Sequence, residues 1–153
     1  MQTTLDEETG AMPECKFCLI VKRSSEATIV FEDDTSMVFL DKRPLFPGHC
    51  LVVPLQHYQT LADLPASLVG RYFECVKLVS MAVERGMIAE GTFVAINNRI
   101  SQSVPHLHVH VVPRRMKDGL KGFFWPRHRY ESREEELKVR DVIRSEIEKL
   151  KTA

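Results

Sequence analysis

Three histidines stand at alternate positions in the C-terminal half of the chain, as His106, His108 and His110, with Leu107 and Val109 between them. A β-strand points successive side chains to opposite faces. The spacing therefore predicts a row of three imidazoles on one face of a strand and apolar side chains on the other. Half of the chain's 6 histidines fall in this short run, so a chance histidine-rich surface explains it poorly.

This row could bind a metal ion or carry out catalysis. Imidazoles two residues apart on a strand are ~6.6 Å apart, and the outer pair is ~13 Å apart. Because zinc–nitrogen bonds are only ~2.1 Å long, one ion can hardly bind all three. A neutral imidazole has a reference pKa of ~6.5 and is a good nucleophile near neutral pH. Flanking imidazoles can stabilise charge on phosphate oxygens, so the row favours nucleophilic attack on phosphorus.

A second arrangement with chemical potential is the pair Cys15 and Cys18, spaced as C-x-x-C. This spacing serves either zinc binding or redox chemistry. Redox use expects a strand-to-helix setting, which the surrounding sequence lacks. Zinc needs further ligands, and His57 and His106 are available. The alternative is two thiols that hold no metal.

The elements that must position these residues follow from hydrophobic periodicity and from turn residues. Regular strand–helix–strand alternation is absent, which argues against a parallel sheet. We expect an α+β domain with a five-stranded antiparallel sheet, one long central helix and a C-terminal helix. The predicted strands are 27–32, 36–41, 49–53, 92–96 and 106–112, and the predicted helices are 68–86 and 134–151.

Length and composition fit a single globular domain. The chain has 153 residues, of which 44% are hydrophobic and 27% charged. We expect a polar leader over 1–13, a core domain over 14–115, and a C-terminal loop and helix over 116–153 packed on that domain. Cys50 and Cys75 fall in a predicted strand and a predicted helix and are interpreted as core residues.

The charge balance limits the partners that the chain can have. Lys+Arg and Asp+Glu both number 21, so a strong positive field for coating nucleic acid or a membrane surface is missing. Neither a transmembrane segment nor a secretory leader is expected. These features indicate a cytoplasmic protein, and in a reducing compartment its four cysteines favour metal binding or core packing over disulfides.

A basic and aromatic segment covers 114–129, where arginines and lysines lie on both sides of Phe123, Phe124 and Trp125. Such a segment could hold a polyphosphate or stack a second base. It could equally pack on the core or on a second subunit, and we favour this packing or dimer contact.

The combined motifs resemble those of the histidine triad (HIT) family of nucleotide hydrolases and transferases. The resemblance spans about residues 15–115. It rests on His106-x-His108-x-His110, the preceding Gln102-Ser103-Val104, the following Val112-Pro113-Arg114, Phe39-Leu40-Asp41, Pro47-Gly48-His49 with 51–54, and His57.

The resemblance implies a catalytic role for four side chains. His108 would attack the α-phosphorus of a nucleotide and form a covalent nucleotidyl-histidine, which water then hydrolyses. The His106 carbonyl would hold the Nδ1 proton of His108 and leave Nε2 free. His110 and His49 would donate hydrogen bonds to phosphate oxygens, and Ser103 would position or protonate the leaving group.

A nucleoside pocket is also implied by the resemblance. Phe17, Ile20 and Phe39 would enclose the base, although ordinary core packing explains the same apolar residues. Asp41 would bind the ribose hydroxyls. The remaining substrate-binding expectations are Asn97, with Asn98 as the alternative phosphate contact, and Gln102.

The chain departs from the family pattern in two places. Residues 97–101 form a shorter segment before the triad and lack the glycine that family members often carry there. Lys42 stands where an apolar residue is frequent. Together with Arg43 it could meet a phosphate chain or remain in solvent.

The resemblance implies a structural zinc ion held by Cys15, Cys18, His57 and His106, as in some bacterial members. It also implies a homodimer. The expected substrate is a dinucleoside polyphosphate, which the Pro-Arg motif favours, or a nucleoside phosphoramidate, and Mg²⁺ could accompany a polyphosphate. The alternatives are a non-catalytic, zinc-stabilised nucleotide-binding or scaffold protein and a nucleotidyl transferase.

Overall fold

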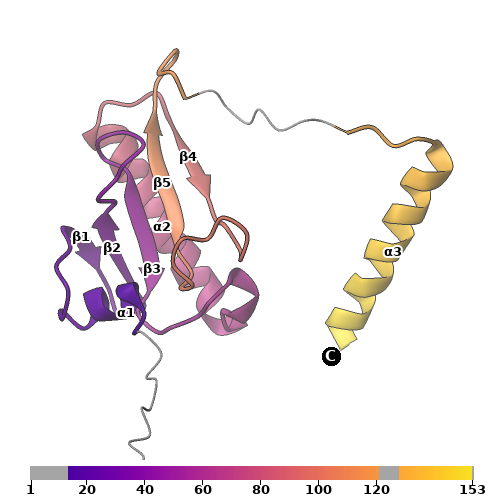
Figure 1. Ribbon diagram of the computed structural model, residues 1–153, viewed down its shortest axis with the longest axis horizontal. Coiled ribbons are helices and arrows are strands. Elements are labelled where there is room, and N and C mark those ends of the chain that lie inside the picture. Colours follow the sequence, from indigo (N-terminus) through magenta and orange to yellow (C-terminus); the bar gives the residue numbers. More distant parts are fainter. Residues whose placement is uncertain (1–13, 121–127, 153) are drawn as a thin grey trace, which may run out of the picture. The chain divides into compact units, whose positions relative to one another are not determined.

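The computed structural model describes residues 14–120 and 128–152 and divides after Asp118 into two compact units. The first unit holds a five-stranded sheet with helices, and the second holds one helix (Figure 1). The elements in chain order are α1 Lys16–Val21, β1 Ile29–Glu32, β2 Ser36–Leu40, β3 Cys50–Pro54, the 3-10 helix η1 Leu61–Asp63, α2 Ala66–Gly86, β4 Gly91–Ala95, β5 Val109–Arg114 and α3 Arg133–Thr152.

The five strands form one antiparallel sheet in the order β1-β2-β3-β5-β4. The α+β prediction is confirmed. Apart from β5, the predicted strands and long helices begin and end within two residues of the observed ones. Neither α1 nor η1 was predicted, because each is too short to give a clear periodic pattern.

The two faces of the sheet carry separate apolar clusters. On one face, α2 packs against strand residues such as Val52, Val109 and Val111, and Cys50 and Cys75 are buried there as predicted. The other face carries α1 (Figure 1), whose Phe17 and Ile20 pack with Phe39 of β2 and Leu51 of β3. Because successive side chains of a strand point to opposite faces, the same strands contribute residues to both apolar clusters.

The prediction of a strand over 106–112 is wrong at its start, since β5 begins at Val109. The backbone before that point bonds elsewhere. The Leu107 N–H donates to the Tyr58 carbonyl at 2.6 Å, and the Pro54 carbonyl accepts a hydrogen bond from Nε2 of His106 at 3.0 Å. His106 and His108 therefore lie in an extended segment that leads into β5, while Leu107 still faces the α2 cluster.

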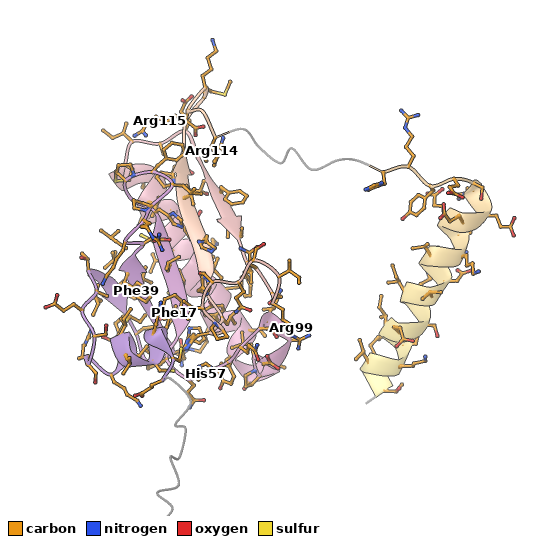
Figure 2. All side chains as sticks on the ribbon, viewed as in Figure 1. Phe17, Phe39, His57, Arg99, Arg114 and Arg115 are labelled. Atoms are coloured by element: carbon orange, nitrogen blue, oxygen red, sulfur yellow. The ribbon has the colours of Figure 1, made fainter. Side chains whose placement is uncertain are left out.

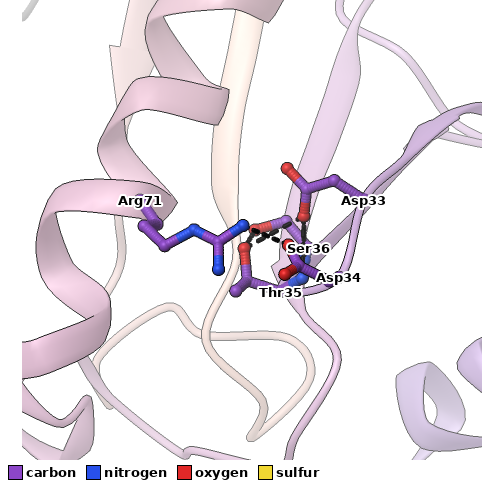
Figure 3. Close-up of polar contacts among 5 residues, drawn as sticks. All are labelled: Asp33, Asp34, Thr35, Ser36 and Arg71. Carbon is purple, nitrogen blue, oxygen red and sulfur yellow. Dashed lines mark hydrogen bonds and ion pairs between the residues drawn. The ribbon is translucent and has the colours of Figure 1, made fainter.

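The turn between β1 and β2 is closed by its own side chains and tied to α2. An oxygen of Asp33 accepts hydrogen bonds from the Thr35 and Ser36 N–H groups, both at 2.8 Å. The neighbouring Asp34 forms an ion pair with Arg71 of α2 (Figure 3). These contacts fix the end of the hairpin that carries Phe39 toward the site.

The second unit contains α3, whose described residues are all at least partly exposed within the unit. Its apolar residues, among them Ile143, Ile147 and Leu150, are exposed there. The expected packing of this helix on the core domain stays a prediction. The central part of the predicted basic aromatic segment, 121–127, lies outside the described residues. Among those that are described, no helix combines the length and apolar character needed to cross a membrane.

Candidate functional site

A tight loop between β2 and β3 brings His49 to the α1 face of the sheet. The Asp41 N–H donates to the His49 carbonyl at 2.9 Å, and the His49 N–H donates to the Phe46 carbonyl at 3.0 Å. Gly48 allows this closure with φ of +94°, and a Cβ there would lie 2.6 Å from Cγ of Met87. His49 itself is buried.

His108 lies beside the start of β5 with one ring nitrogen occupied. Its Nδ1 lies 2.8 Å from the His106 carbonyl, which can only accept, so Nδ1 carries the proton. Burial lowers the pKa of His108, although the His106 carbonyl and Asp41 raise it. The ring is therefore neutral near pH 7, and its Nε2 offers a lone pair.

His110 and His49 lie next to this ring and are bonded to each other. The distance from His49 Nε2 to His110 Nδ1 is 3.0 Å, and the His110 ring centre lies 5.0 Å from that of His108. Burial, together with the neighbouring His108 and His49, lowers the pKa of His110 to about 4, although Asp41 raises it. Burial also lowers the pKa of His49. This arrangement differs from the expected one, in which both rings donate directly to phosphate, because Nε2 of His49 is already bonded to His110.

An open cavity of about 440 Å³ brings together five of the predicted site residues. These are Phe17 and Ile20 from α1, Phe39 from β2, Asp41 just after it and Ser103 from the segment before the triad. Phe17 and Phe39 lie side by side (Figure 2), with ring centroids 5.3 Å apart. The centroid of the Phe17 ring lies 5.1 Å from that of His108. Phe17 thus lines the cavity and also contacts His108 of the triad.

The three apolar residues are both core and cavity wall. Phe17, Ile20 and Phe39 belong to the α1-face cluster and also line the cavity. The two interpretations that the sequence left open are therefore compatible. Lys42 and Arg43 line the same cavity.

The remaining predicted substrate residues lie in the segment between β4 and the triad. The Gln102 amide donates to the Gln59 carbonyl at 2.6 Å and accepts from the Arg99 N–H at 2.8 Å, which braces the segment. The Asn98 side-chain oxygen accepts from the Leu61 N–H at 2.9 Å, whereas Asn97 is exposed. Neither Gln102 nor Asn97 lines the cavity.

Cys15, Cys18, His57 and His106 form a cluster whose ligand atoms all lie within 4.8 Å of one another. Sulfur–nitrogen distances in it are 3.5 Å, 3.3 Å and 3.6 Å. In a tetrahedral zinc site, bonds of ~2.3 Å to sulfur and ~2.1 Å to nitrogen place such ligand atoms roughly 3.5 Å apart. The predicted ligand set is thus assembled with spacing that fits zinc.

The protonation of His106 also fits a metal ligand. Its Nε2 donates to the Pro54 carbonyl, so its Nδ1 lone pair faces the two thiols. Metal-binding histidines usually donate their second nitrogen in this way. Burial lowers the pKa of His106 to about 4, which keeps the ring neutral. Burial, and after it the neighbouring Cys15, raises the pKa of the Cys18 thiol to about 11. The thiol is therefore protonated near pH 7 unless a bound cation stabilises the thiolate.

Helix α1, which supplies Phe17 and Ile20 to the cavity wall, was not predicted from the sequence. Phe17, Ile20 and Val21 have the i, i+3, i+4 spacing of a helix, and this is the only signal that could have revealed α1. It covers less than two turns and overlaps the C-x-x-C motif, so the segment was interpreted through its motif and its resemblance and not as a helix.

The antiparallel α+β fold, the histidine row and the cluster of two cysteines and two histidines match one family of known proteins. The family model described as the HIT domain matches residues 22–117. The chain therefore belongs to the HIT family, as its motifs predicted.

Two curated relatives carry enzyme names. The adenylylsulfatase HINT3 of Arabidopsis thaliana is 33% identical over 116 residues, covering 74% of this chain and 59% of the relative. The asymmetrical bis(5′-nucleosyl)-tetraphosphatase of Schizosaccharomyces pombe is 32% identical over 92 residues, covering 59% of this chain and 50% of the relative. The chain thus spans between half and three fifths of these two enzymes, and the family includes hydrolases of nucleotide compounds.

A solved structure bears on the metal cluster. The zinc-bound histidine triad protein of Mycobacterium smegmatis is 36% identical and superposes with a TM-score of 0.66, covering 79% of this chain and 86% of that one. A zinc ion is thus bound by a structural relative, and the cluster in this chain has ligands of the kind that zinc prefers.

Proposed function

We propose that this protein is a nucleotide hydrolase that cleaves a nucleoside 5′-phosphoryl bond through a covalent nucleotidyl-histidine. One observation carries the proposal. His108 is buried and neutral, its Nδ1 proton is held by the His106 carbonyl, and its ring contacts Phe17, which lines an open cavity of about 440 Å³.

The reaction has two steps. Nε2 of His108 attacks the α-phosphorus, a phosphorus–nitrogen bond forms, and the bond from phosphorus to the leaving group breaks. Water then attacks the same phosphorus and loses a proton, which returns to Ser103 or passes to solvent. The phosphorus–nitrogen bond breaks, His108 regains its Nε2 lone pair, and the nucleoside monophosphate leaves. His110 stabilises the phosphate oxygens, and Ser103 donates a proton to the leaving group or positions it.

The nucleoside would occupy the cavity beside α1. Phe17, Ile20 and Phe39 supply apolar contact to the base, and the Asp41 carboxylate accepts from the ribose hydroxyls. Asn97 contacts phosphate in this proposal, because the oxygen of Asn98 is bonded to Leu61. Gln102 supports that segment.

The substrate class that we favour is a dinucleoside polyphosphate, with a nucleoside phosphoramidate as the second candidate. Lys42 and Arg43 line the cavity and add positive charge that suits a polyphosphate. Mg²⁺ would then enter with the substrate. A panel that compares phosphoramidates with dinucleotides of different phosphate number separates the two.

Zinc has a structural role in the proposal. Cys15, Cys18, His57 and His106 would fill a tetrahedral site and leave no position for water, which is typical of structural zinc. The ion would connect α1 to the segment that carries His108. We further propose a cytoplasmic homodimer, since thiolate ligands suit a reducing compartment and balanced charge does not oppose association.

Replacement of His108 by Asn tests the proposal. We expect loss of turnover of a fluorogenic adenosine phosphoramidate and of dinucleotides, with nucleotide binding retained. His128→Asn, in the second unit, is the control and should keep wild-type rates.

Absence of turnover in the wild-type protein across the whole panel would instead support a zinc-stabilised scaffold. Transfer of the nucleotidyl group to an acceptor other than water would indicate a transferase.

A further inference from the structure

The backbone N–H of Leu45 donates to Nδ1 of His49 at 3.0 Å. A backbone amide can only donate, so Nδ1 of His49 must accept and cannot carry a proton. The ring is neutral, and its single proton therefore lies on Nε2. A group outside the triad thus fixes the tautomer of a buried imidazole.

His49 in turn fixes the tautomer of His110. Nε2 of His49 lies 3.0 Å from Nδ1 of His110, so the proton on His49 is donated to His110. Nδ1 of His110 must then accept, and the neutral ring of His110 carries its own proton on Nε2. Neighbouring rings of one residue type thereby differ: His108 offers a lone pair at Nε2, and His110 offers a proton there.

We propose that the Leu45 amide is a positioning group that, through His49, makes His110 a hydrogen-bond donor at the catalytic centre. The inference rests on the proposed function in one respect, which is that the donated proton serves a phosphoryl group. Two backbone groups of opposite polarity set the two rings, the His106 carbonyl for His108 and the Leu45 amide for His110.

The surrounding loop is built to hold this amide in place. Leu45 lies between Pro44 and Pro47, and the loop is closed by backbone bonds from Asp41 to His49 and from His49 to Phe46. The Leu45 side chain is 52% exposed, so the residue acts on the site through its amide.

The same hydrogen bonds affect metal binding at His49 and His110. Asp41, His49 and His110 have ligand atoms within 4.8 Å of one another and could be taken for a cation site. A metal ion at Nε2 of His49 would need the proton on Nδ1, where the Leu45 N–H already points. The hydrogen-bond chain therefore excludes metal from this cluster, in contrast to His106, whose protonation suits zinc.

Nitrogen-15 NMR of the histidine rings in zinc-loaded protein tests the assignment directly. We expect His49 and His110 of the wild type to be protonated at Nε2 and His108 at Nδ1. Leu45→Pro removes the amide proton, and we expect the His49 signals to lose the single-tautomer pattern. Leu45→Ala keeps the amide and should keep the tautomer. Protonation of His49 or His110 at Nδ1 in the wild type would overturn the proposal.

Kinetics and a metal probe complete the test. We expect Leu45→Pro to lower kcat relative to Leu45→Ala by about 10- to 100-fold, with little change in KM, as for loss of a supporting hydrogen bond. Co²⁺ added to zinc-loaded wild-type protein should leave the His49 and His110 signals unshifted, and Co²⁺ binding there would contradict the inference. A wild type without turnover would defeat the proposed function alone, since the NMR result does not depend on activity.

Discussion

Each triad histidine has its proton fixed by a different neighbour. His106 donates from Nε2 to the Pro54 carbonyl, and His108 donates from Nδ1 to the His106 carbonyl. His110 accepts at Nδ1 from His49. Three side chains of one type therefore suit three tasks, which are metal ligation, nucleophilic attack and hydrogen-bond donation.

The role of the Asp41 carboxylate can be tested by substitution. Its carboxylate lines the cavity, and Asp41→Asn would weaken the hydrogen bonds that it accepts from the ribose. Because hydrogen bonds to a charged group contribute about 1.5–3 kcal/mol, we expect kcat/KM for ribonucleotide substrates to fall about 10- to 100-fold. The rate for 2′-deoxyribonucleotides should change less.

The ratio of ribonucleotide to deoxyribonucleotide rates is the measurement that checks this role. Asp34→Asn is the control, since Asp34 lies on the β1–β2 turn and does not line the cavity. An unchanged ratio in Asp41→Asn would show that the carboxylate does not contact the ribose.

The types and spacing of residues revealed much of this site. His106, His108 and His110, the C-x-x-C pair and Asp41 carry side-chain chemistry that is visible in the sequence. The Leu45 contribution is not visible, because a backbone amide is present at every residue except proline, and only the fold determines which one meets His49.

At the scale of elements, the β1–β2 turn links stability to pH. Partial burial raises the pKa of Asp33, but hydrogen bonds from Thr35 and Ser36 lower it by more, so the net pKa lies below the ordinary 3.8. The carboxylate thus stabilises the fold above pH 3.8, and the stabilisation is lost as the pH falls through the folded-state pKa.

We expect Asp33→Asn to lower the free energy of unfolding by about 1 kcal/mol at pH 7 and to flatten its fall below pH 4. Denaturant unfolding at several pH values measures both. Asp34→Asn, which removes only an exposed ion pair with Arg71, should cost about 0.5 kcal/mol or less. Equal costs for the two variants would contradict this account of the turn.

Elements with strong periodicity were predictable, and the others depended on tertiary contacts. Residues 106–112 alternate in hydrophobicity as a strand would, yet β5 starts at Val109. The Leu107 N–H bonds to the Tyr58 carbonyl, and the Pro54 carbonyl bonds to the His106 ring, so neither group joins the sheet at that point. Those partners are distant in the sequence, so no local pattern could reveal the displacement.

At the scale of the molecule, the cluster of Cys15, Cys18, His57 and His106 joins three separate segments of the first unit. A zinc ion bound there stabilises only the folded chain. If free zinc exceeds the dissociation constant a hundredfold, the ion contributes roughly 3 kcal/mol.

We expect His57→Asn, or a chelator, to reduce zinc well below one ion per chain and to lower Tm. Elemental analysis and thermal unfolding are the measurements, and His128→Asn is the matched control, since His128 belongs to neither cluster. Wild-type protein purified without chelators and found free of zinc would rule out the site.

The central claim is that His108 becomes covalently bonded to the nucleotide, and rapid mixing with substrate, an alkaline quench and peptide mass spectrometry test it most directly. We predict a nucleoside monophosphoryl group on His108 of the wild type and none in His108→Asn. A group attached to a different residue, or wild-type turnover with no attached group at any quench time, would contradict the account.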